Sequence, residues 1–190
     1  MKTKIRLKSF TATALLIFTD LSWGDCKNIS GTVQLIPEMD TCSILQRTDT
    51  PRKYPTLTFL YSLGVPGPTC FVSEFSGQIN RTAIHGDGVS GMTLSSFNAP
   101  QALNIDGHQA FTAATTLRMT DSNNNLLGTL YLMDSGINSL NDVNDPNDDT
   151  TNERLVVIGG TGMFQKYKGQ IDIVGNEFSG ANIVQGRICE

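Results

Sequence analysis

The sequence predicts an all-β domain of about eight short strands, arranged as a closed antiparallel barrel or as a sandwich. Glycine occurs 18 times, threonine, serine and asparagine are abundant, and aromatic residues make up only 7%. This composition favours strands and turns over helices. Apolar and polar residues alternate in several segments, and no segment has a convincing apolar stripe at helical spacing. A closed barrel leaves no exposed edge strands, which suits a single domain of this length.

The first two predicted strands enclose an irregular segment. Residues 29–36 predict the first strand. Residues 37–55 are rich in proline and predict no regular element. Residues 56–63 alternate apolar and polar side chains, and they predict a second strand that stops at the glycine- and proline-rich run 64–68.

Six more strands are predicted after this run. Their ranges are 70–80, 108–120, 126–134, 154–158, 167–174 and 181–188. Residues 86–88 (Gly-Asp-Gly) predict a turn, and residues 121–125 predict a polar hairpin loop. Alternation predicts which side chains share a face: Phe71, Ser73, Phe75 and Gly77 in the first of these strands, and Phe111, Ala113, Thr115, Leu117 and Met119 in the second.

The first 24 residues have the pattern of a secretory signal peptide. Four cationic residues precede the apolar run 10–18, and Ser22 and Gly24 place small residues before a cleavage site. We therefore expect a signal peptide over 1–24, a single β domain over 25–190, and a secreted protein, extracellular or periplasmic. Removal of the signal peptide would leave a mature chain with a net charge of −7, which disfavours nucleic acid as a partner. The apolar run is too short to predict a transmembrane segment.

The cysteine count fits export. Four cysteines lie after the predicted cleavage site: Cys26, Cys42, Cys70 and Cys189. An even number in an exported chain predicts two disulfides, and three pairings are possible. Cysteine and histidine ligands at short spacing are missing from the sequence, so we expect no metal site and no cofactor.

The most specific motif lies between two predicted strands. A strand runs into Gly159-Gly160-Thr161-Gly162, Phe164 follows, and the next strand contains Gly169. A phosphate-binding loop would require Lys-Ser/Thr and a helix after the glycines, and the sequence signals neither. Glycine permits the positive φ of a tight turn, so we expect Gly159, Gly160 and Gly162 to form a structural turn that Phe164 closes.

This segment resembles the strand–GGTG–Phe–strand segment of the allene oxide cyclase and dirigent barrel superfamily. The resemblance covers roughly residues 70–188 and implies a closed antiparallel eight-stranded up-and-down barrel. It also implies a small apolar ligand, or an intermediate that the barrel orients. The catalytic and pocket residues of that superfamily lie outside the matched stretch, so none is assigned here.

An up-and-down barrel also suggests the disulfide pairing. Its first and last strands pair antiparallel, so Cys26, just before the first strand, would lie beside Cys189, just after the last. Cys42 and Cys70 then pair with each other. The alternative joins Cys26 to Cys42 and Cys70 to Cys189.

Candidate site residues are few. Glu74, Arg118 and Tyr131 are polar residues within predicted strands, and they would line a ligand pocket if they face inward; alternation alone does not say which face is inside. The acidic run 141–153 lacks the glycine of a calcium-binding loop and predicts a solvated loop. His85 and His108 lie at predicted strand ends and have no partner at the spacing of a catalytic triad.

Three classes of function follow. The first is a secreted barrel that binds a small apolar ligand or orients a reactive intermediate without covalent catalysis. The second is an isomerase of the allene oxide cyclase type, which export and disulfides disfavour. The third is an interaction module without a pocket. A homo-oligomer, dimer or trimer, is compatible with each of them.

Overall fold

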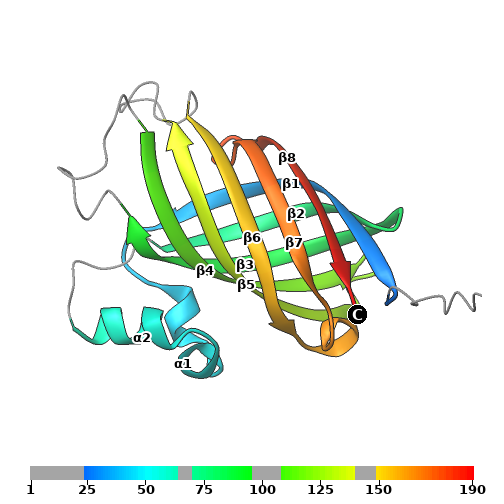
Figure 1. The fold of residues 1–190 in the computed structure, drawn as a ribbon, viewed down its shortest axis with the longest axis horizontal. Helices are drawn as coiled ribbons and strands as arrows, with labels where there is room; N and C mark the ends of the chain where they lie inside the picture. Colours follow the sequence, from blue (N-terminus) through cyan, green and yellow to red (C-terminus); the bar gives the residue numbers. More distant parts are fainter. Residues whose placement is uncertain (1–23, 64–69, 96–107, 140–148) are drawn as a thin grey trace, which may run out of the picture.

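The structure is a computed structural model that describes residues 24–63, 70–95, 108–139 and 149–190. Eight antiparallel strands close into a barrel in sequence order, each paired with the next and the last with the first (Figure 1). The strands are β1 (Cys26–Glu38), β2 (Cys70–Ile79), β3 (Thr82–Ser95), β4 (His108–Asp121), β5 (Leu126–Ser139), β6 (Thr150–Gly160), β7 (Lys168–Asn176) and β8 (Ala181–Cys189). The eight-stranded up-and-down barrel is therefore confirmed.

The number of strands is right, but two of the predicted elements are wrong. Residues 56–63 belong to a helix, α2 (Pro55–Ser62), and not to a strand. The alternating apolar residues that suggested a strand do not share a buried face, because Leu57 is fully buried while Phe59 and Tyr61 are 60% and 52% exposed. Pro55 starts this helix at a position where the missing N–H costs nothing.

The second error concerns β3, which contains the predicted turn at 86–88 in its middle. Gly86 and Gly88 belong to the inward face, where space is short. A Cβ on Gly88 would lie 2.0 Å from the Ser73 hydroxyl oxygen, and one on Gly86 would lie 2.9 Å from a Leu117 methyl group. These glycines are required by close packing inside the barrel and not by a turn.

The segment between β1 and β2 packs against the outside of the barrel. It contains the short helices η1 (Ser43–Gln46) and α1 (Thr50–Lys53) followed by α2, which Figure 1 shows beside the barrel wall. Ile44, Tyr54 and Leu57 from this segment pack on Val89, Ala114 and Tyr131 of the wall. The Cys42–Cys70 disulfide ties the segment to the start of β2.

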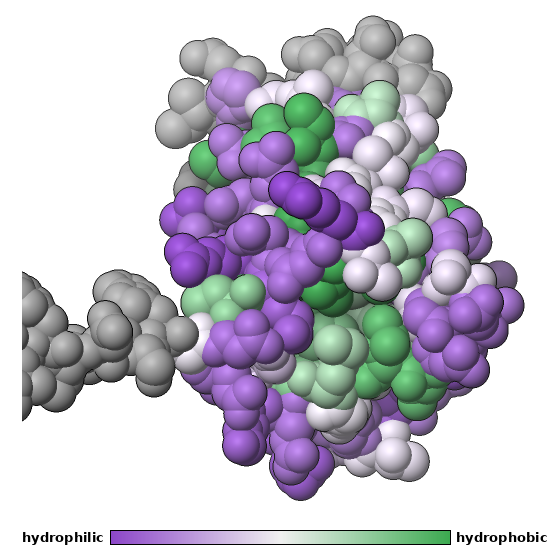
Figure 2. All heavy atoms as spheres, turned by 90° about the vertical axis from the view of Figure 1, so that its right-hand side faces the viewer, coloured by the Kyte–Doolittle hydropathy of each residue, from purple (hydrophilic) through white to green (hydrophobic). Residues whose placement is uncertain are grey.

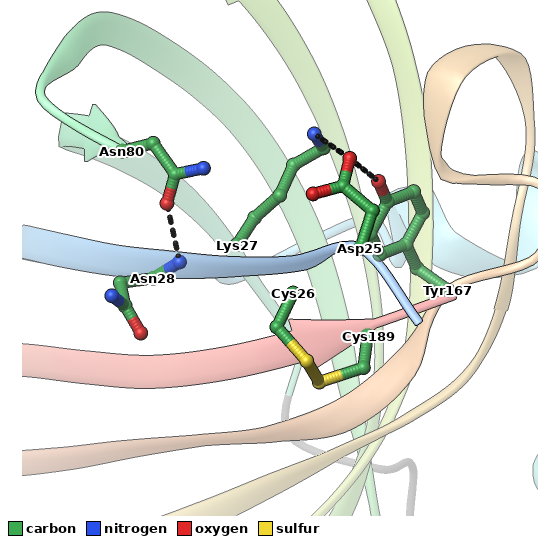
Figure 3. The surroundings of a disulfide bond; sticks show 7 residues. All are labelled: Asp25, Cys26, Lys27, Asn28, Asn80, Tyr167 and Cys189. Atoms are coloured by element: carbon green, nitrogen blue, oxygen red, sulfur yellow. Dashed lines mark hydrogen bonds and ion pairs between the residues drawn. A yellow bond between two sulfur atoms is a disulfide. The ribbon is translucent and has the colours of Figure 1, made fainter. Parts of the chain in front are cut away.

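The barrel closes between β1 and β8, where Cys26 lies opposite Cys189 in the strand register. These two cysteines form a disulfide (Figure 3), which confirms the predicted pairing. Polar contacts surround it. Asp25 accepts a hydrogen bond from Lys27 at 2.9 Å and one from the Tyr167 hydroxyl at 3.3 Å, and Asn80 accepts one from the Asn28 N–H at 2.8 Å.

Phe164 closes the same end of the barrel. It is fully buried on the short helix η3 (Gly162–Phe164) and meets the Tyr167 ring edge to face, with ring centroids 6.5 Å apart. Figure 2 shows this end of the molecule, where apolar residues lie among hydrophilic ones. Met163, next to Phe164 on η3, is exposed, and so is Leu126 at the start of β5. The described helices include none long and apolar enough to span a membrane.

Gly159 and Gly160, which were predicted to belong to the turn, are the last two residues of β6, and of the three glycines only Gly162 has a positive φ. The three are therefore expected to differ in their tolerance of a side chain. Gly162 has a φ of +58°, and a Cβ there would lie 2.4 Å from the Leu127 carbonyl oxygen. Replacing Gly162 by valine should therefore cost about 1 to 3 kcal/mol of unfolding free energy. Gly159→Val is the matched control, because its Cβ would have only Lys53 Nζ, at 3.6 Å, nearby. Equal melting temperatures for the two variants would contradict a structural role for the turn.

Candidate binding site in the barrel lumen

The interior of the barrel is apolar over most of its length. A cavity of about 60 Å³ lies among side chains from seven of the strands. Its apolar lining residues are Ile29, Val33, Leu35, Phe75, Leu117, Met119, Leu132, Leu155, Ile171, Ile173 and Val184. The side chains predicted to share one face of β4 face inward, since Thr115, Leu117 and Met119 all line this cavity. The lumen is therefore an apolar, concave space of the kind that binds small molecules.

A second cavity, of about 40 Å³, lies nearer the end of the barrel opposite the Phe164 plug. Phe71, Met92 and Phe111 form its apolar part, and Phe178 packs against Phe71 with ring centroids 6.1 Å apart. The two cavities share Leu35, Glu153 and Glu177 in their linings. They therefore meet where two carboxyl groups enter the lumen.

Three carboxyl groups gather at this point, each from a different element. Asp134 lies on β5 and Glu153 on β6, while Glu177 lies in the turn between β7 and β8. Their exposed fractions are 3%, 7% and 2%, respectively. We refer to Asp134, Glu153 and Glu177 as the carboxyl cluster. Acidic side chains are almost never this buried unless they are paired, so the cluster marks the lumen as a candidate functional site.

The hydrogen bonds of the carboxyl cluster are incomplete. Asp134 Oδ2 accepts a hydrogen bond from the Thr115 hydroxyl, but Asp134 Oδ1 has no partner among the described residues. Glu153 lines both cavities, and burial and the charges of Glu177 and Asp134, without a hydrogen bond from a described residue, act on its carboxyl group. The nearby Thr151 hydroxyl donates to Asn138 Oδ1 at 3.0 Å.

Burial shifts the proton equilibria of all three groups. Loss of hydration raises the pKa of Asp134 to about 8, although the hydrogen bond from Thr115 opposes the shift. Burial raises the pKa of Glu177 to about 7, although the nearby Thr151 hydroxyl opposes the shift. The pKa of Glu153 lies well above its usual value because of burial and then because of repulsion by Glu177 and Asp134. The cluster therefore holds protons at neutral pH, and its carboxyls can donate as well as accept hydrogen bonds.

The helical segment between β1 and β2 supports, from outside the barrel, the part of the wall that contains Thr115. The Tyr54 hydroxyl donates to the Thr115 carbonyl oxygen and accepts from the Leu132 N–H at 3.1 Å. These two residues face each other across β4 and β5, and both line the larger cavity. Burial raises the pKa of Tyr54, so this hydroxyl keeps its proton. The segment thus fixes the position of Thr115, the residue that holds Asp134.

The residues predicted to line a pocket are placed elsewhere. Glu74 is exposed on the outer face of β2, and Arg118 is exposed on β4, where it pairs with Asp87 at 3.7 Å. Tyr131 is buried, but under the outer helices, where its hydroxyl donates to Asp49 and Lys53 lies 4.4 Å above its ring. The structure does not bring these three side chains together in the lumen, because each of them points outward from its strand.

Sequence patterns alone do not reveal the carboxyl cluster. Glu153 ends the acidic run that predicts a solvated loop, yet it is the fourth residue of β6 and points inward. The strand predicted over 126–134 ends at Asp134, whereas β5 continues to Ser139. Glu177 lies in a turn, where no sequence pattern marks it.

The two histidines, His85 and His108, are exposed. The described residues contain no group of three or more His, Cys, Asp or Glu side chains placed to hold a metal ion.

Fold and site together define a disulfide-bonded, closed eight-stranded barrel whose lumen contains a buried carboxyl cluster. Comparison with known proteins adds no relative: no family model matches the chain, and no curated protein or solved structure matches it.

Proposed function

We propose that this barrel is a secreted binding protein that holds a small, largely apolar ligand in its lumen and does not form a covalent bond with it. The observation that carries the proposal is the apolar cavity with carboxyl groups at one end. Apolar walls supply affinity, and a few convergent polar groups fix orientation, which is the usual composition of a ligand site. The resemblance of the GGTG turn to dirigent-type barrels supports the same function, and the two disulfides are compatible with an extracellular location.

The size of the lumen favours slender ligands. Its cavities measure about 60 and about 40 Å³. An engineered apolar cavity of about 150 Å³ is large enough to bind benzene. A short aliphatic chain with one polar end therefore fits this lumen better than an aromatic ring, which would require the wall to move.

A paired substitution on β8 tests whether the ligand lies inside. Val184 faces the cavity, and its neighbour Ile183 is 60% exposed on the outer wall. Val184→Phe should fill the lumen and lower the affinity for n-butanol at least tenfold, as measured by ligand-observed NMR titration, because no space remains for the chain. Ile183→Phe should leave the affinity unchanged. Equal affinities for the two variants, both folded by circular dichroism, would place the binding outside the lumen.

The isomerase is the second candidate, and the proton-holding carboxyls are the observation in its favour. A buried carboxylic acid whose pKa lies near neutrality can donate and recover a proton. Mass spectrometry of the small molecules that co-purify with the natively secreted protein separates the two candidates. A binding protein returns its ligand unchanged on repeated incubation, whereas an isomerase converts it.

A further inference from the structure

The carboxyl cluster has no positively charged partner in the protein. Among the described residues no lysine, arginine or histidine is buried, and the linings of both cavities contain none. The four described salt bridges all lie elsewhere, between Lys27 and Asp25, Arg118 and Asp87, Arg154 and Asp172, and Lys166 and Glu190. Buried carboxyl groups are normally compensated by a cation or by a full set of hydrogen bonds.

The cluster also has unused hydrogen-bonding capacity, and its Glu153 and Glu177 side chains face the ligand space. Asp134 Oδ1 is buried without a partner, and the Glu153 carboxyl, 7% exposed, has no hydrogen-bond donor among the described residues. Glu153 and Glu177 line the larger cavity, whose other walls are almost wholly apolar. A ligand that lies in this cavity therefore meets carboxyl oxygens at one end and hydrocarbon along the rest of its length.

From this geometry, and resting on the proposed function, we infer that the lumen selects an aliphatic amine, with the ammonium group at the carboxyl cluster and the chain directed toward Phe164. An ammonium group has three N–H donors, and two carboxyl groups from different elements, those of Glu153 and Glu177, line the cavity to accept them. Its charge supplies the counter-ion that the protein lacks. An alcohol of the same shape supplies one donor and no charge, and a carboxylate ligand is repelled.

Amine binding should release protons. The titratable groups that face the ligand from the described elements are Glu153 and Glu177. Asp134 interacts electrostatically with both of them, and burial raises the pKa of all three carboxyl groups. A cation within a few ångströms favours the ionised form, so part of the bound protons leaves when the amine enters. The affinity for an amine is therefore expected to rise between pH 6 and pH 8, while that for an alcohol stays constant.

Isothermal titration at pH 8 with n-butylamine, n-butanol and butyrate tests this inference. These probes share one chain and differ in the polar end. We expect n-butylamine to bind at least tenfold more tightly than n-butanol, with proton release visible as a dependence of the heat on the buffer, and butyrate to bind least. Glu153→Gln should abolish the preference for the amine and retain n-butanol binding. Glu74→Gln, the matched control on the outer wall, should change neither.

The outcomes separate this inference from the proposed function. Equal binding of n-butylamine and n-butanol would overturn the selection for amines and leave a neutral-ligand barrel. Amine binding that Glu74→Gln weakens as much as Glu153→Gln would place the amine on the acidic outer surface and overturn the inference. If none of the three probes binds, both the selection for amines and the proposed ligand-binding function are overturned.

Discussion

The barrel should be several kcal/mol more stable at pH 5 than at pH 9. Burial raises the pKa values of Asp134 and Glu177 to about 8 and about 7 in the folded state, and it raises that of Glu153 as well. The unfolded chain loses these protons near pH 4, so between pH 4 and pH 8 the folded state binds more protons than the unfolded state. Stability contributed by such groups is fully present below the unfolded pKa and is lost as pH rises through the folded pKa.

Glu177 alone should contribute on the order of 3 kcal/mol to this difference, since each unit of pKa shift corresponds to about 1.4 kcal/mol. The pKa values of Asp25 and Asp121 are lowered, by Lys27 and Asn125 respectively, so their opposite effect is confined to pH values below about 4. Urea unfolding at a series of pH values measures the free energy directly.

Glu153→Gln should flatten the pH profile and should be more stable than the wild type at pH 9, because a neutral amide carries no buried charge. Glu74→Gln is the control and should reproduce the wild-type profile, since Glu74 is exposed on the outer wall of β2. A wild-type profile that rises from pH 5 to pH 9 would contradict the burial of ionisable carboxyls in the lumen.

Loss of the Cys26–Cys189 disulfide should have the second large effect. The bond joins residues 163 positions apart, and in the chain-entropy model a loop of this length stabilises the folded state by roughly 5 kcal/mol. The double variant Cys26→Ser, Cys189→Ser should therefore unfold at a much lower urea concentration. Its denaturant slope should rise, because the unfolded chain is no longer held in a loop.

The second disulfide provides the matched comparison. Cys42 and Cys70 are 28 positions apart, for which the same model gives roughly 3.5 kcal/mol. The Cys42→Ser, Cys70→Ser variant should lose less stability, and its loss should appear mainly at the outer helices that this bond ties to β2. Equal losses for the two double variants, or a smaller loss for the Cys26–Cys189 pair, would contradict the role of the first bond in closing the β1–β8 seam.

Most of the strands followed from sequence because they depend on local and repeated features, while the closed barrel was implied by the resemblance of the GGTG segment. Alternation identified which side chains share a face on β2 and on β4, and the closure of β1 on β8 brought Cys26 beside Cys189. The errors came from residues whose role is set by distant neighbours. Gly88 is a glycine because Ser73 of another strand occupies the space of its Cβ, and α2 is a helix although its apolar residues alternate.

The candidate site was beyond sequence reasoning for the same reason. Alternation along a strand puts Glu74 and Phe75 on opposite faces, but it does not say which of the two lies inside the closed barrel. Asp134, Glu153 and Glu177 are separated by 19 to 43 positions in sequence and come together only because β5, β6 and the β7–β8 turn are neighbours in the barrel. The one available signal was Glu153 in an alternating segment, where Thr151 and Leu155 share its face.

Binding of a ligand inside the lumen is tested most directly by NOEs between that ligand and methyl groups of the wall. Protein with carbon-13-labelled Leu, Ile and Val methyls is saturated with n-butylamine. The account predicts NOEs from the butyl chain to Leu117, Leu155 and Val184, which line the cavity. Val156 and Ile183, the neighbours of Leu155 and Val184 on the outer faces of the same strands, should show none. NOEs to those outer methyls, without any to the three inner residues, would contradict it.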